Sequence, residues 1–119
     1  MPKKIGTGEG RAALAAVAAA SGAPARAELA TAVRYLLQLL AEKAPGSSVE
    51  VRVPPFGAVQ VVEGPRHTRG TPPNVVETDP LTWIAVATGA ERWTDAAAAG
   101  RILASGVRSD LSDLLPLRP

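Results

Sequence analysis

The chain has 119 residues, of which 46% are hydrophobic and 20% charged; these values suit one globular domain and exclude a disordered chain. Thirteen Lys and Arg residues nearly balance eleven Asp and Glu residues, leaving a net charge of +2, so the composition does not indicate nucleic-acid binding. The sequence has no Cys, which excludes disulfides and thiol catalysis. Because 23 residues are Ala and only 4 are aromatic, we expect a small, aliphatic core.

The N-terminal part begins with a glycine-rich stretch and continues into an Ala-rich run. We expect residues 1–10 to form a flexible leader, because their three glycines loosen the backbone and no apolar pattern docks them. Residues 11–119 then make up the folded domain, which begins with a short helix over residues 11–20. No apolar run near the start is long enough for a signal peptide or a membrane-spanning helix, so we expect a soluble, cytoplasmic protein with no integral membrane segment.

The clearest pattern in the chain is a stripe of apolar residues at spacings of three and four, which predicts the main helix over residues 24–44. Pro24 suits the first turn of that helix, and Pro45 and Gly46 end it. The stripe faces either a packed core or a ligand cavity. It consists of Leu29, Val33, Leu36, Leu37 and Leu40.

The hydrophobic period then changes from that of a helix to that of a strand. Valines alternate with polar residues over residues 49–53 and again over residues 59–61, and the turn residues between these runs predict a hairpin. Residues 66–73 are polar and rich in turn formers, with room for a short strand. Residues 74–78 predict a further strand.

Helices and strands alternate in the second half of the chain. Asp79 and Pro80 form a strong helix start, since Asp accepts from free backbone amides and Pro suits the first helical position. Gly89 is the expected end of that helix. This order predicts a single α+β domain in which helices cover one face of a mixed sheet. The remaining expected elements are a brief helix over residues 96–99, a last strand over residues 101–105 and a terminal turn capped by Ser109.

Two stretches of the sequence, each followed by or ending in a glycine, resemble the sterol carrier protein 2 family, in particular its small stand-alone bacterial members. The first is NVVETDPLTW, residues 74–83, followed by Gly89; it resembles the strand, the acidic helix start and the glycine-ended helix of the family. The second run extends from Trp93 to Gly106 and resembles the short helix and strand that come next. The resemblance covers residues 28–117 approximately.

The resemblance implies a mixed sheet of roughly five strands with helices packed on one face, and an apolar tunnel between the two layers. It also implies a non-catalytic carrier that binds a lipid or another hydrophobic small molecule in that cavity. The family occurs as a fused accessory domain in larger enzymes too, so the alternative function is a protein-interaction or accessory subunit with a closed cavity. The many alanines fit either outcome, since small side chains leave room for a ligand or let the layers approach.

The expected cavity walls come from the main helix, the hairpin and the helix that follows Asp79. The same side chains could instead pack on one another, because apolar stripes at helical and strand spacings usually form core. The candidates are Leu36, Leu40, Val59, Val61, Trp83 and Ile84.

A basic loop supplies the candidates for contact with a lipid head group or with a protein partner. Arg66, His67 and Arg69 could bind a carboxylate or a phosphate through charge-assisted hydrogen bonds. Alternatively, this loop is solvated and its arginines pair with Glu63 and Glu77.

The sequence offers little for catalysis or for metal binding. A single His cannot form a multi-histidine metal site, and no GxSxG motif marks a nucleophile. Asp110 and Asp113 are three residues apart, a spacing that a favourable interaction with a helix dipole explains. We therefore expect no catalytic residue, no metal and no cofactor.

Overall fold

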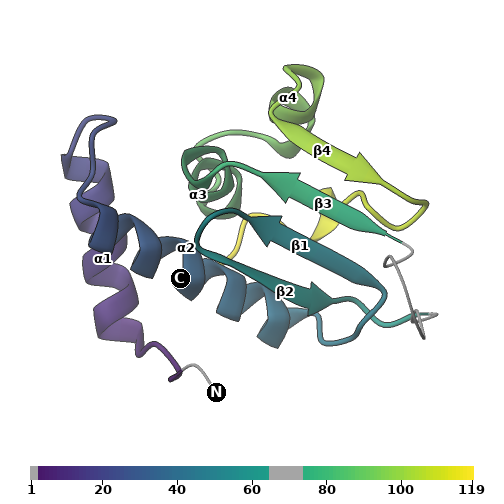
Figure 1. Ribbon diagram of the computed structural model, residues 1–119, viewed down its shortest axis with the longest axis horizontal. Helices are drawn as coiled ribbons and strands as arrows, with labels where there is room; N and C mark the ends of the chain where they lie inside the picture. The colour runs from purple at the N-terminus through teal and green to yellow at the C-terminus, as the bar shows by residue number, and fades with distance from the viewer. Residues whose placement is uncertain (1–2, 65–73) are drawn as a thin grey trace.

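The computed structural model describes residues 3–64 and 74–119. Helices and strands follow one another in these residues much as the sequence predicts (Figure 1). The elements, in chain order, are α1 (Thr7–Ala19), α2 (Arg26–Lys43), β1 (Val49–Val53), β2 (Gly57–Val61), β3 (Val75–Thr78), α3 (Pro80–Thr88), α4 (Trp93–Ala98), β4 (Ile102–Ser105) and the short 3-10 helix η1 (Ser112–Leu114).

The strands form one mixed sheet in the order β2-β1-β3-β4. β1 pairs antiparallel with β2 and parallel with β3, and β3 pairs antiparallel with β4. The predicted α+β domain with a mixed sheet is confirmed, but the number of strands is four within the described residues and not roughly five. All four runs that the sequence marks as strands do pair, and no other described segment joins them; the short strand considered for residues 66–73 lies outside the described residues.

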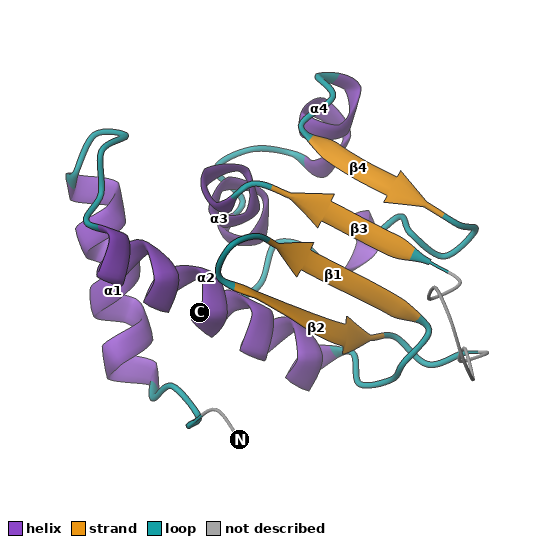
Figure 2. Cartoon of the chain, viewed as in Figure 1, coloured by secondary structure: helices purple, strands orange, loops and turns teal. Residues whose placement is uncertain are grey.

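One face of the sheet is covered and the other is open. In the view of Figure 2, α2 runs behind β1 and β2, α3 lies beyond the end of β3, and no helix crosses in front of the strands. The alternation in β1 follows this arrangement, since its three valines are buried while Glu50 and Arg52 are half-buried on the opposite face. The main core therefore lies between the sheet and the two helices that pack on it.

Helix α3 begins and ends where the sequence predicts. The Asp79 carboxylate accepts a hydrogen bond from the Thr82 backbone N–H at 2.9 Å and another from the Thr82 hydroxyl at 2.7 Å. Pro80 is the first helical residue, and Gly89 ends the helix in the left-handed conformation, with φ of 87°. These local signals are strong for different reasons: Asp79 accepts from a backbone N–H that the helix end leaves free, Pro80 has no N–H to leave unpaired, and Gly89 adopts the left-handed conformation without strain.

Helix α1 starts earlier than predicted. It begins at Thr7, four residues before Arg11, and so includes part of the segment expected to be a leader. Gly10 is buried against α2, and a Cβ added there would overlap the ring of Tyr35. The close approach of the two helices thus depends on a glycine whose partner lies far away in the sequence.

The C-terminal turn has a different cap from the predicted one. The Asp110 carboxylate, not Ser109, accepts from a backbone N–H at the start of the turn, that of Ser112, at 2.9 Å. The hydroxyl of Ser109 donates instead to the carbonyl of Gly106 at 2.8 Å. The prediction of Ser109 as the cap is wrong, because the N–H of Ser112 donates to Asp110 instead.

In the part of the chain that the structure describes, no helix is both long enough and apolar enough to cross a membrane.

Candidate ligand-binding site

Four of the six predicted cavity residues lie in the filled core. Leu36, Leu40 and Val61 have no exposed surface, and Trp83 is 1% exposed. All four belong to one cluster of buried side chains between the helices and the sheet. The indole N–H of Trp83 donates to the carbonyl of Val33 on α2 at 3.3 Å, which satisfies its buried polar atom. These four side chains are therefore closely packed in this structure.

The other two predicted wall residues lie at the margin of the same cluster and pack against it. Val59 is half-buried and lines a hollow beside the N-terminal segment. Ile84 is half-buried and packs against a small second cluster that joins α1 and α2. The structure thus does not bring all six residues to one cavity. The head-group candidates Arg66, His67 and Arg69 lie outside the described residues.

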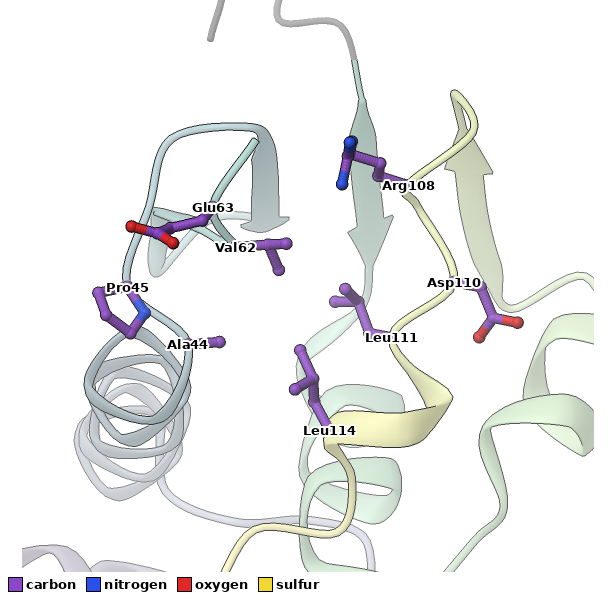
Figure 3. Close-up of a pocket in the computed structure, with 8 residues that line it drawn as sticks. All are labelled: Ala44, Pro45, Val62, Glu63, Arg108, Asp110, Leu111 and Leu114. Carbon is purple, nitrogen blue, oxygen red and sulfur yellow. The ribbon is translucent and has the colours of Figure 1, made fainter. Parts of the chain in front are cut away.

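A different cavity opens at one end of the core, and we call it the end cavity. It has a volume of about 410 Å³ and lies between the C-terminal end of α2, the segment after β2 and the segment after β4 (Figure 3). The side chains of its interior are aliphatic, whereas its charged residues lie at the rim. Its lining consists of Ala44, Pro45, Val62, Glu63, Arg108, Asp110, Leu111 and Leu114.

The aliphatic side chains of the end cavity point toward one another across the opening. Figure 3 shows Ala44 and Val62 on one side and Leu111 and Leu114 on the other, while the carboxylate of Asp110 points away. Leu111 is only 1% exposed and belongs to the main core cluster. The floor of the end cavity is therefore continuous with the core between helices and sheet.

The wall made by Val62 depends on an unusual backbone conformation. Val62 has φ of 67°, which is rare for a β-branched residue. Its N–H donates to the carbonyl of Ala44 at 2.7 Å, and its carbonyl accepts from both the N–H and the hydroxyl of Ser48, at 3.1 and 2.7 Å. A Cβ at Gly46 would overlap the Val62 backbone. Three hydrogen bonds and a glycine thus hold Val62 beside the end of α2.

The opposite wall is the C-terminal segment, which is attached at several points. The N–H of Arg108 donates to the side-chain carbonyl of Asn74 at 2.9 Å, and the amide group of Asn74 donates to the carbonyl of Ser48 at 2.7 Å. Lys43 on α2 donates to the carbonyl of Leu114 at 2.7 Å. The end cavity, which is open to solvent, is therefore bordered on two sides by backbone segments that hydrogen bonds hold in place.

The charges at the rim do not neutralise one another through close ion pairs. Ion pairs within residues 3–64 and 74–119 join Lys4 to Glu42, Glu50 to Arg52 and Glu91 to Arg101, away from the end cavity. The backbone N–H of Ser112 donates to Asp110, and this hydrogen bond lowers the pKa of the Asp110 carboxyl. Asp110 is therefore ionised at neutral pH. Over the same residues, no group of three or more His, Cys, Asp or Glu is placed to hold a metal ion.

Sequence reasoning missed the end cavity because its lining residues come from three separate segments. The only local signal is the pair Leu111 and Leu114, whose apolar side chains follow a polar turn near the C-terminus. Nothing in the sequence indicates that Val62 turns back toward Ala44, since that contact forms only when β2 meets the end of α2.

The family of the chain follows from a comparison with known families. A family model described as "Bacterial SCP ortholog", where SCP denotes sterol carrier protein, matches residues 25–117. A comparison with curated proteins finds no match. Proteins of the sterol carrier type are generally non-catalytic lipid carriers, which suggests a lipid-carrier-type role. The matched residues extend from the start of α2 to the C-terminal segment and include every strand of the sheet. The chain therefore belongs to the bacterial family of small, sterol carrier protein-like domains.

Proposed function

We propose that this domain binds a lipid or another hydrophobic small molecule without catalysing a reaction, and that the end cavity is the binding site. The observation that carries the proposal is an aliphatic cavity, continuous with the core, in a chain of the sterol carrier family. Its volume of about 410 Å³ falls within the range of small-molecule pockets, which begins near 300 Å³.

The aliphatic lining also suits a ligand that gains its affinity from burial. Each methylene group removed from water contributes about 0.8 kcal/mol, so a chain of roughly eight carbons supports micromolar binding after the costs of association. Uncharged chains suit this cavity best, since its interior side chains carry no charge. We therefore expect it to bind alcohols and sterols as well as fatty acids.

Leu111 belongs to the same core cluster as Leu36, Leu40, Val61 and Trp83. A ligand that displaced it would enter the layer where the sequence analysis predicts the cavity. Arg66, His67 and Arg69 remain the sequence-based candidates for contact with a head group.

Filling the end cavity tests this proposal. Ala44→Leu places a larger side chain in the opening, because Ala44 points into it (Figure 3). We expect its affinity for decanol, measured by titration calorimetry, to fall at least tenfold. Ala27→Leu is the matched control, since it makes the same change at an exposed position of α2 and should leave binding unchanged. Equal affinity of both variants for decanol would refute the end cavity as the site.

A second candidate function is that of an accessory subunit that binds a protein partner. The close packing of Leu36, Leu40, Val61 and Trp83 favours it, because a filled interior leaves no tunnel between the layers. Affinity capture from the native host tests it with the tagged protein and with the double variant Arg66→Glu/Arg69→Glu. A stoichiometric partner that the variant loses supports this function, whereas a monomer without partners in both samples contradicts it.

A further inference from the structure

A second hollow, separate from the end cavity, lies beside the N-terminal segment, and we call it the N-terminal pocket. Its volume is about 390 Å³, and it is bounded by the N-terminal segment, one side of α2 and the start of β2. It shares no residue with the end cavity. Its lining consists of residues 3–5 and 56–59 together with Arg34, Leu37, Gln38 and Glu42.

The inner part of the N-terminal pocket is apolar. Leu37 is 2% exposed and Phe56 is 7% exposed, and both belong to the main core cluster. Ile5 and Val59 are half-buried and complete the apolar surface. A short alkyl chain lying here would replace water next to four hydrophobic side chains.

The outer part of the N-terminal pocket is positively charged. Lys3, Lys4 and Arg34 line it, against one carboxylate, that of Glu42. Glu42 is within 3.1 Å of Lys4, so it neutralises at most one of the three cations. Arg34 uses its Nε–H to donate to the carbonyl of Phe56 at 2.8 Å, and its two terminal amino groups are separate donors that this bond does not use.

The segment that carries the two lysines is held against α2. The N–H of Ile5 donates to the side-chain carbonyl of Gln38, and the amide group of Gln38 donates to the carbonyl of Ile5, each at 2.9 Å. This reciprocal pair fixes the backbone next to Lys3 and Lys4. Residues 3–5 precede the part of the chain that matches the family, which starts at residue 25, so the pocket depends on residues outside that match.

We propose that the N-terminal pocket binds an amphiphilic anion, namely a carboxylate or a phosphate monoester with a short alkyl chain. The alkyl chain lies against Leu37, Phe56 and Val59, and the anionic group lies between Arg34 and the two lysines. Guanidinium and ammonium groups bind carboxylates and phosphates through charge-assisted hydrogen bonds. The site goes beyond the proposed carrier function, since it needs neither the end cavity nor a tunnel.

Four eight-carbon probes test this site: octanoate, octyl phosphate, octanol and octylamine. The amide NMR signals of Ile5, Gln38 and Val59 report on the pocket, and those of Val62 and Leu111 report on the end cavity. We expect octanoate and octyl phosphate to shift the first set, octylamine to leave it unchanged, and the affinity for the anions to fall as salt is added. Shifts of similar size with octylamine, or anion-induced shifts confined to Val62 and Leu111, would overturn the proposal.

Charge-removing variants provide the second test. Lys3→Gln/Lys4→Gln should weaken octanoate binding at least fivefold, whereas Arg11→Gln/Arg118→Gln removes the same charge from exposed positions outside the pocket and should leave it unchanged. If both double variants lost the same affinity for octanoate, the loss would reflect only the change in net charge. That result would contradict a binding site in the N-terminal pocket. Decanol binding to the end cavity should be the same in the unsubstituted protein and in both double variants. Failure of the N-terminal pocket proposal is therefore distinguishable from failure of the carrier proposal.

The same chemistry could be presented by a free amphiphile or by a lipid head group. Sedimentation with vesicles of phosphatidylglycerol and with vesicles of phosphatidylcholine separates these sources. Because the pocket holds a short chain as well as an anion, we expect free octanoate to bind. The proposal would be contradicted if the protein sedimented with the phosphatidylglycerol vesicles but bound neither free octanoate nor free octyl phosphate.

Discussion

Two glycines of α1 show how strongly the effect of a substitution on stability depends on what surrounds the residue. Gly10 is buried beneath Tyr35, whereas a Cβ added at Gly8 meets nothing within 4 Å. Both residues lie in the same helix. The helix propensity of Ala exceeds that of Gly at both positions, so propensity alone would make neither substitution destabilising.

Gly10→Ala is expected to destabilise the protein although it improves helix propensity. The added methyl group forces Tyr35 or α1 to move, and such overpacking costs about 1–3 kcal/mol. Gly8→Ala should leave the free energy of unfolding unchanged or raise it by up to about 1 kcal/mol. Urea unfolding of the two variants measures both values. A Gly10→Ala protein as stable as Gly8→Ala would contradict the close packing of α1 on α2.

At the scale of elements, Asp110 makes a hydrogen bond that contributes to the C-terminal turn. Asp110 accepts from the backbone N–H of Ser112, and this bond lowers its pKa. A group whose pKa is lower in the folded state stabilises the fold above its ordinary pKa and loses that effect as the pH falls through the folded value. The contribution is therefore present at neutral pH and disappears in acid.

Asp110→Ala should lower the free energy of unfolding at pH 7 by about 0.5 kcal/mol, the lower end of capping effects, because the group is exposed. The difference from the unsubstituted protein should shrink as the pH falls from the ordinary pKa of an Asp carboxyl through the lower folded-state pKa of Asp110. Asp113→Ala is the control, and thermal unfolding at several pH values measures both. A constant difference for Asp110→Ala at all pH values would show that its carboxylate is not the cap.

The elements themselves could largely be predicted because their signals are local. The alternating valines of β1, the helical spacing of Leu36 and Leu40, and the capping pair Asp79 and Pro80 each act within a few residues. The start of α1 could not be predicted in this way, since the burial of Gly10 depends on Tyr35.

The candidate site was harder to predict than the elements. The sequence places Leu36, Leu40, Val61 and Trp83 on core-facing sides of their elements, and the structure shows them buried. Whether such side chains surround a cavity or fill it depends on how closely the layers approach, which no periodicity encodes. The end cavity arises where Val62 bonds to Ala44, a contact between segments that no local pattern connects.

At the scale of the whole molecule, the covered face of the sheet determines where a ligand can reach the core. The described residues pack closely in the middle of the layer between sheet and helices, and the end cavity lies at its margin, beside the end of α2. The hydrophobic floor formed by Leu111 connects the two regions. Under the proposed function, a ligand approaches the core from this end and not through the open face of the sheet.

Native mass spectrometry of the protein purified from its own host tests the central claim, that this domain binds a hydrophobic small molecule. The account predicts that the purified protein carries an additional mass of lipid size, which solvent extraction removes. When the extracted protein is mixed with decanol or a sterol, it should gain a mass that matches the added compound. A bare protein mass before extraction, with no mass gained from decanol, fatty acids or sterols afterwards, would contradict it.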